Sequence, residues 1–269
     1  MSANFQIKEF LLRQGFLLAK PVAGDRLEAF FARLRQHYVS MDLIRVGGDS
    51  DGGYLLPDIL DEVTCCFSPG VDQTSTFERA LSTDRNIRSY MADASVDGPA
   101  IEDPNFDFEK KFLGNRDEGV LMTLGSWVDR KVGPDTGDML LQMDIEGAEY
   151  DILTLEDTAL FRRFSCILIE FHYVERLFDK QFYQLFSSVM EKLYRDFSIC
   201  HIHLNNCCGV VSREGFEIPR VIEMTLVRND YAKRLDNGGT ITIPHPLDRR
   251  NVDHKEDIAL APIWWKQSS

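Results

Sequence analysis

Apolar residues recur at helical spacing in the first forty residues of the chain. Residues 5–18 and 27–34 carry an apolar side chain every three or four positions, which predicts two helices separated by a proline and a glycine. A glycine-rich, turn-like segment follows at residues 47–54. We therefore expect an N-terminal helical extension over residues 1–40 and one larger domain over residues 41–269.

From residue 63 onward, short apolar runs alternate with helical patterns. The predicted strands lie at residues 64–67, 87–91, 120–124, 139–145, 166–171, 199–204 and 221–227. Continuous apolar runs are typical of strands buried on both faces, and alternation with helices predicts a parallel sheet covered on both sides. The last two strands are joined by a loop without a helical pattern, which favours an antiparallel hairpin at the sheet edge. The sequence thus predicts an α/β fold whose ligands bind beyond the carboxyl ends of the strands.

Polar residues follow the first two predicted strands. Gly70 lies in the first turn, where a glycine lets the backbone approach a ligand closely. Asp72, Ser75 and Glu78 follow it, although Asp72 or Ser75 could instead cap the next helix. Asp93 ends the second strand, 21 residues beyond Asp72. A carboxylate at this position grips the ribose diol in nucleotide-type sites, and the alternative is a solvated loop aspartate.

The strands at residues 139–145 and 166–171 also end in ionisable residues. Asp144 and Glu146 flank one apolar residue and would share a face of a strand, unless they cap the following helix. His172 offers a proton acceptor, because a neutral histidine accepts a proton near pH 7, and Glu170 offers its orienting partner. A histidine at a strand end can equally be packed or exposed without a catalytic role.

The composition limits the classes of partner. The chain has 269 residues and 44% apolar residues, which is enough for one α/β domain with additions. Its net charge of −13 repels phosphate backbones and anionic membrane surfaces, so we expect no nucleic-acid partner. Because no uninterrupted apolar leader or stretch of roughly 20 apolar residues is found, we also expect no membrane span and a cytoplasmic location.

Six cysteines fit that expectation. They include two adjacent pairs, at residues 65–66 and 207–208, and adjacent cysteines seldom bridge to each other. We therefore expect buried, reduced thiols. A zinc site is the alternative, because His201 and His203 precede Cys207, although no C-x-x-C pair supports it.

Two segments resemble the FkbM-type methyltransferase family. Residues 143–149 read Met-Asp-Ile-Glu-Gly-Ala-Glu, and residues 167–172 read Ile-Leu-Ile-Glu-Phe-His. In that family one strand ends in D-x-E-G-x-E and the next ends in Glu, often followed by an apolar residue and His. The Asp-Gly-Gly-Tyr segment at residues 51–54 resembles one found upstream in a branch of the family. The similarity covers residues 44–228, but the first loop departs from the pattern because Gly70 is its one glycine.

The resemblance implies a class I methyltransferase (Rossmann-like) sheet, S-adenosylmethionine as the methyl donor, and O-methylation, commonly of sugars or polyketide hydroxyls. By position, Gly70 and Asp72 would lie beside the methionine part of the cofactor and Asp93 at its ribose. Ser75 and Glu78 belong to the same cofactor loop, and Asp144 would line the cleft between cofactor and acceptor.

We therefore expect an O-methyltransferase that acts on a hydroxyl of a sugar or glycan-type substrate. His172 is the predicted base, with Glu170 to orient it, and Asp144 is the alternative, acting directly or through Mg²⁺ or Mn²⁺. Asp144, Glu170 and His201 are candidate ligands of such a divalent metal. A nicotinamide-dependent oxidoreductase would need a G-x-G-x-x-G turn, which Gly70 alone does not make. The other alternative is a non-catalytic sugar- or partner-binding module on the same fold.

Overall fold

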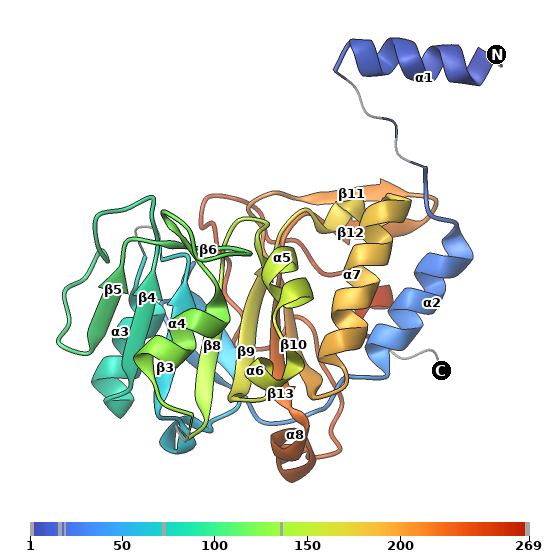
Figure 1. Cartoon of the computed structure of the whole chain (residues 1–269). Coiled ribbons are helices and arrows are strands. Elements are labelled where there is room, and N and C mark those ends of the chain that lie inside the picture. Colours follow the sequence, from blue (N-terminus) through green and yellow to red (C-terminus); the bar gives the residue numbers. More distant parts are fainter. Residues whose placement is uncertain (1–2, 16–17, 19, 72–73, 135–136, 267–269) are drawn as a thin grey trace.

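A seven-stranded sheet forms the centre of the computed structural model, which describes residues 3–15, 18, 20–71, 74–134 and 137–266. The strand order is β10-β13-β9-β8-β3-β4-β5 (Figure 1). The strands are β3 (Cys65–Pro69), β4 (Arg88–Ala92), β5 (Phe106–Glu109), β8 (Met139–Met143), β9 (Phe164–Phe171), β10 (Phe197–Leu204) and β13 (Ile222–Arg228). Five neighbouring strands, from β9 to β5, are parallel, whereas β13 pairs antiparallel with both β9 and β10. The prediction of an α/β fold with a mostly parallel sheet is confirmed.

Helices cover both faces of this sheet. They are α3 (Thr76–Arg85), α4 (Leu124–Lys131), α5 (Glu149–Leu155), α6 (Thr158–Phe161), α7 (Lys180–Leu193) and α8 (Asn229–Leu235), with 3-10 turns at Leu60–Glu62, Val174–Phe178 and Pro262–Trp264. Neighbouring strand residues belong to opposite cores because successive side chains of a strand point to opposite faces. Leu141 packs in the cluster that contains Trp127 and Phe186, whereas Leu140 packs in the cluster that contains Phe77. Burial of both faces explains the continuous apolar runs of the sequence.

The two N-terminal helices differ in their contacts. Helix α2 (Gly24–Arg35) buries Phe31 and Leu34 in the larger core, and the ring of Phe31 lies 4.8 Å from that of Trp264. Helix α1 (Ala3–Arg13) stands apart from the rest of the molecule in Figure 1, with Phe10 62% exposed. The expected helices are therefore present, and the second packs against the larger domain.

The third strand of the main sheet was wrongly predicted. The run at residues 120–124 contributes only β7 (Leu121–Met122), which pairs with β6 (Phe112–Leu113) outside the main sheet. The place beside β4 is taken by β5, from a segment in which no strand was predicted. Strand β5 lies at the sheet edge and is half-buried throughout, so its Phe-Asp-Phe-Glu sequence lacks the apolar run of a central strand.

Two further hairpins stand beside the main sheet. The turn-like segment at residues 47–54 is the tip of a hairpin formed by β1 (Ile44–Gly47) and β2 (Gly53–Leu56). A second hairpin, β11 (Val210–Arg213) and β12 (Phe216–Pro219), is inserted between β10 and β13. Both hairpins matter for the site, because residues next to them line the cavity described below.

Candidate functional site

A cavity of about 920 Å³ opens at the carboxyl ends of the parallel strands. This is the volume expected of a site for a small molecule or cofactor. Six of the residues expected from the sequence line it, namely Gly70, Glu78, Asp93, Asp144, Glu170 and His172. Ser75 and His201 are not among the lining residues, and Asp72 lies outside the residues that the structure describes. Tyr54, from the Asp-Gly-Gly-Tyr segment, also lines the cavity, as does Gln142, which the sequence did not single out.

Gly70 makes the closest backbone approach in the site. Its φ of +83° lies in the left-handed region, and a Cβ built on it would come within 1.4 Å of the backbone oxygen of Asp144. The backbone N–H of Gly70 donates to the carbonyl of Ala92, at the end of the neighbouring strand. Only glycine therefore fits where the ends of three strands meet.

Asp93 holds the turn that follows Gly70. Its Oδ2 accepts a hydrogen bond from the backbone N–H of Val71 at 3.2 Å, and its Oδ1 accepts from the N–H and hydroxyl of Ser95 at 2.8 and 2.6 Å. The side chain is buried and lines the cavity. The carboxylate at the end of β4 is thus fixed against the turn at the end of β3.

Ser75 and Glu78 lie at the start of α3. The expected capping role of Ser75 is not observed, and its buried hydroxyl has no hydrogen-bond partner among the described residues. Burial raises the pKa of Glu78, whose carboxyl contacts the hydroxyl of Ser68. That hydroxyl also lies 2.7 Å from Oε1 of Gln142, whose amide nitrogen donates to the hydroxyl of Tyr54 at 3.0 Å. A continuous polar chain therefore runs along the cavity wall, since Glu78, Gln142 and Tyr54 all line the cavity.

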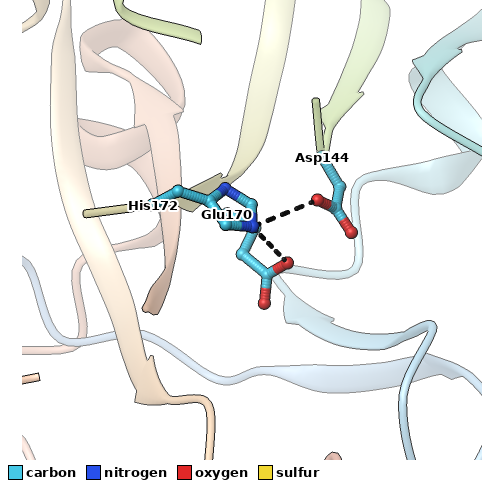
Figure 2. Close-up of side chains that lie close together, drawn as sticks. All are labelled: Asp144, Glu170 and His172. Carbon is cyan, nitrogen blue, oxygen red and sulfur yellow. Dashed lines mark ion pairs between the residues drawn. The ribbon is translucent and has the colours of Figure 1, made fainter. Parts of the chain in front are cut away.

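Asp144, Glu170 and His172 point toward one another on the wall of the cavity (Figure 2). Nε2 of His172 lies 3.8 Å from Oδ1 of Asp144 and 3.5 Å from Oε2 of Glu170. Their ligand atoms all lie within 4.8 Å of one another, which is close enough for the three side chains to hold one metal ion. Glu146 adds a third acid, because its Oε2 lies 3.4 Å from the same histidine nitrogen.

This group concentrates negative charge in a poorly solvated place. Burial, together with the charge of Glu170, raises the pKa of Asp144, and burial with the charge of Glu223 raises the pKa of Glu170. Burial alone would lower the pKa of His172, but the neighbouring carboxylates raise it. Oδ1 of Asp144 is buried without a hydrogen-bond partner among the described residues. Like charges held this close favour a cation or a proton between them.

Glu149 contacts both the backbone and the ring of His172, and it was not among the expected site residues. Its carboxylate is fully buried, and Oε1 accepts a hydrogen bond from the backbone N–H of His172 at 2.7 Å. The same oxygen lies 3.4 Å from Nδ1 of the imidazole. Oε2 accepts from the backbone N–H of Gly147 at 2.8 Å. The second acid of the D-x-E-G-x-E stretch, Glu146, has a side chain that is 84% exposed, whereas the third, Glu149, is fully buried.

His201 does not join the acids that we expected it to accompany. Its Nε2 lies 3.0 Å from Oδ1 of Asp248, and His203 contacts the same carboxylate at 3.7 Å. Among the described residues, the group with metal-ligand spacing contains His172 in its place. His201 and His172 lie on different strands, β10 and the end of β9, with β13 between them. Only the strand order reveals this separation.

Residues 89–199 match the family model of the methyltransferase FkbM domain. The matched region runs from β4 to β10 and includes Asp93, Asp144, Glu170 and His172. The resemblance seen in the sequence is thereby confirmed, and the match supports a methyltransferase, a class of enzyme that generally uses S-adenosylmethionine. No curated protein matches the chain. Within the described residues, no helix has the length and apolar character needed to cross a membrane.

Proposed function

We propose that this protein is an S-adenosylmethionine-dependent O-methyltransferase that acts on a hydroxyl of a sugar or glycan-type substrate. The observation that carries the proposal is the group of Asp144, Glu170 and His172 on the wall of a cavity that also contains Gly70 and Asp93. The cavity thus combines a turn of the type that binds nucleotides with three ionisable side chains that can accept or release a proton. Residues 41–269 form the proposed methyltransferase domain.

The arrangement of the sheet supports this reading. Counted in chain order, its seven strands lie in the order 6-7-5-4-1-2-3, and the seventh is antiparallel to its neighbours. This order and the antiparallel seventh strand support the proposal of a class I methyltransferase sheet. In doubly wound sheets the ligand lies beyond the carboxyl ends of the first strands, where Gly70 and Asp93 are found.

In this proposal the cofactor lies against the turn at Gly70, with its ribose at Asp93. Bound there, it supplies an electrophilic methyl group on a sulfonium. The absence of a side chain at Gly70 lets this turn pack directly against the backbone oxygen of Asp144, and the carboxylate of Asp93 can accept hydrogen bonds from a ribose diol. Asp144 lines the same cavity and would lie between the cofactor and the acceptor hydroxyl.

The acceptor hydroxyl must lose its proton as it is methylated. Although burial alone would lower the pKa of His172, the unneutralised carboxylates around it raise that pKa and so favour the protonated imidazole. A protonated imidazole cannot accept a proton. We therefore favour a divalent cation, such as Mg²⁺ or Mn²⁺, held by Asp144, Glu170 and His172, over His172 as the free base. Bound there, the cation would acidify the acceptor hydroxyl.

The protein supplies the remaining parts of this arrangement. Glu149 holds the imidazole from its Nδ1 side, the pattern typical of metal-bound histidines. Asn205 donates a hydrogen bond to Oε1 of Glu170 and so fixes that carboxylate. The exposed carboxylate of Glu146 can pass the released proton to solvent.

Metal removal separates the two mechanisms. Turnover would be measured with candidate glycans and labelled S-adenosylmethionine, before and after exhaustive chelation, and methylated products identified by mass spectrometry. We expect chelation to abolish turnover and Mn²⁺ or Mg²⁺ to restore it, while cofactor affinity in calorimetry changes little. Full activity in excess chelator would exclude the cation and return the role of base to His172. A chain that binds the cofactor but methylates no acceptor would support the non-catalytic alternative.

A further inference from the structure

Two adjacent cysteines are joined on the wall of the cavity. The structure links Cys207 and Cys208 by a disulfide, so the expectation that adjacent cysteines stay reduced and unbridged is wrong for this pair. Both residues line the cavity, with Cys207 half-buried and Cys208 exposed. The bond is therefore reachable from solvent.

The remaining four cysteines differ in every respect that governs thiol reactivity. Cys65, Cys66, Cys166 and Cys200 are unpaired and buried. Burial raises the pKa of each of these thiols, to about 11 in the case of Cys65. A thiol reacts through its thiolate and needs access to its reagent, so the buried cysteines are poor targets. Any thiol chemistry of the folded chain is thus concentrated at Cys207 and Cys208.

The pair is connected to the acid group of the cavity through one amide side chain. The backbone N–H of Cys207 donates to Oδ1 of Asn205 at 2.9 Å, and Nδ2 of Asn205 donates to Oε1 of Glu170. On the other side, Nζ of Lys255 donates to the carbonyl of Cys207 at 2.6 Å. The turn that carries the disulfide is therefore held at both sides, and Asn205 links it to Glu170.

We propose that Cys207 and Cys208 form a redox-modification site, which a small dithiol reductant opens and a trivalent arsenical then occupies. The thiolate of the reductant attacks the exposed Sγ of Cys208, the disulfide breaks, and Cys207 leaves as a thiolate that takes up a proton. The second thiol of the reductant resolves the mixed disulfide, which releases Cys208 as a thiol and the reductant as a cyclic disulfide. An organic arsenoxide condenses with the two thiols to form two As–S bonds and one water molecule.

Opening the disulfide also affects the hydrogen bonds that Asn205 makes with Cys207 and Glu170. The bridge closes a small ring over two consecutive residues, and its loss frees the backbone of Cys207 that donates to Asn205. The effect on Glu170, unlike the thiol chemistry itself, bears on catalysis only if the proposed function is right. Support of a ligand by its neighbour commonly contributes about 10–100-fold in metal affinity or activity, so we expect reduction to lower turnover about tenfold.

The site is tested by counting accessible thiols on the native full-length chain. Intact-mass analysis after alkylation should find no adduct before dithiothreitol and two adducts after it. Phenylarsine oxide should add once, only after reduction. Cys207→Ser should expose one thiol without any reductant and lose retention of the arsenical, whereas Cys200→Ser should respond as the unaltered chain does. Two results would overturn the proposal. One is that two thiols are accessible before reduction and stay accessible after oxidation with diamide. The other is that the Cys207→Ser variant still retains the arsenical.

A second measurement separates this proposal from the proposed function. Cofactor affinity and methyl transfer would be compared for the oxidised, reduced and arsenical-treated chain. A thiol response accompanied by about tenfold lower turnover supports both the site and its link to Glu170. A thiol response with unchanged turnover overturns the link through Asn205. A thiol response in a chain that methylates nothing in any state overturns the proposed function and leaves the modification site supported.

Discussion

Oε1 of Glu149 lies 3.4 Å from Nδ1 of His172 and accepts a hydrogen bond from the backbone N–H of the same residue at 2.7 Å. One buried carboxylate thus fixes both the main chain and the ring of the histidine. Because Glu149 belongs to α5 and His172 follows β9, this contact also joins two neighbouring elements at the cavity.

Glu149→Gln should impair the site more than the fold. The amide oxygen can still accept one of the two backbone hydrogen bonds, from His172 or from Gly147, and the substitution removes the charge that orients the imidazole. We expect turnover or metal affinity to fall about 10–100-fold. Steady-state kinetics and metal titration would measure this, with the thermal midpoint recorded for both chains. Asp151→Asn, an exposed acid on the same helix, is the matched control and should change neither. Equal losses in both variants would contradict the orienting role.

Asp93→Asn should weaken cofactor binding. The carboxylate lines the cavity and accepts hydrogen bonds from the turn after Gly70, so its charge favours a ribose diol at this place. We expect a loss of about 1–3 kcal/mol in the affinity for S-adenosylmethionine or its demethylated product, measured by calorimetry. The control is Asp97→Asn, whose side chain is 98% exposed and pairs with Lys110. Unchanged affinity in the Asp93 variant would remove that residue from the site.

Gly70→Ala should both destabilise the protein and close the cofactor turn. A Cβ at this position would overlap the backbone oxygen of Asp144, and the φ of +83° disfavours any side chain. We expect the free energy of unfolding to fall by about 2–4 kcal/mol, measured by urea denaturation. Gly98→Ala is the control, because a Cβ there meets no atom within 4 Å. It should change stability by no more than about 0.5 kcal/mol. A Gly70 variant of normal stability that binds the cofactor would show that the turn can move.

The contact between His203 and Asp248 should make stability depend on pH above neutrality. Burial alone would lower the pKa of His203, but Asp248 and the charge of Glu223 raise it to about 9. Because this lies above the unfolded value of about 6.5, the stabilisation is complete below that pH and is lost as the pH rises towards 9. Burial alone would raise the pKa of Asp248, but hydrogen bonds from His201 and His203 lower it. The contribution of ionised Asp248 to the free energy of unfolding is therefore lost only in acid.

We expect the free energy of unfolding to fall by about 2–3 kcal/mol between pH 6.5 and 9. Urea denaturation at closely spaced pH values would measure this. His203→Gln should be less stable at pH 6.5 and show a flatter profile, whereas His254→Gln, at an exposed position, should keep the original profile. A wild-type stability that rises through this interval would show that His203 is neutral in the folded protein.

The alternation of apolar runs and helical patterns determined the α/β fold, because burial on both faces of a central strand leaves a local signal in the sequence. The same logic placed Asp93, Asp144, Glu170 and His172 at strand ends, and the carboxyl ends of parallel strands share one edge. These residues therefore line one cavity in the structure. Strand β5 escaped detection because an edge strand is half-buried and carries no such run.

Only the tertiary structure decided which partners these residues have. The strand order separated His201 from the acids of the cavity, and the chain beyond α8 brought Asp248 to its side. The packing of α5 against the end of β9 turned Glu149 inward to His172, although Glu146 and Glu149 look alike in the sequence. The fold of the turn after β10 brought Cys207 and Cys208 together on the cavity wall. The periodicity of a sequence indicates which face of a helix or strand is buried. Contacts between residues of different elements depend on how those elements pack, and no local sequence pattern contains that information.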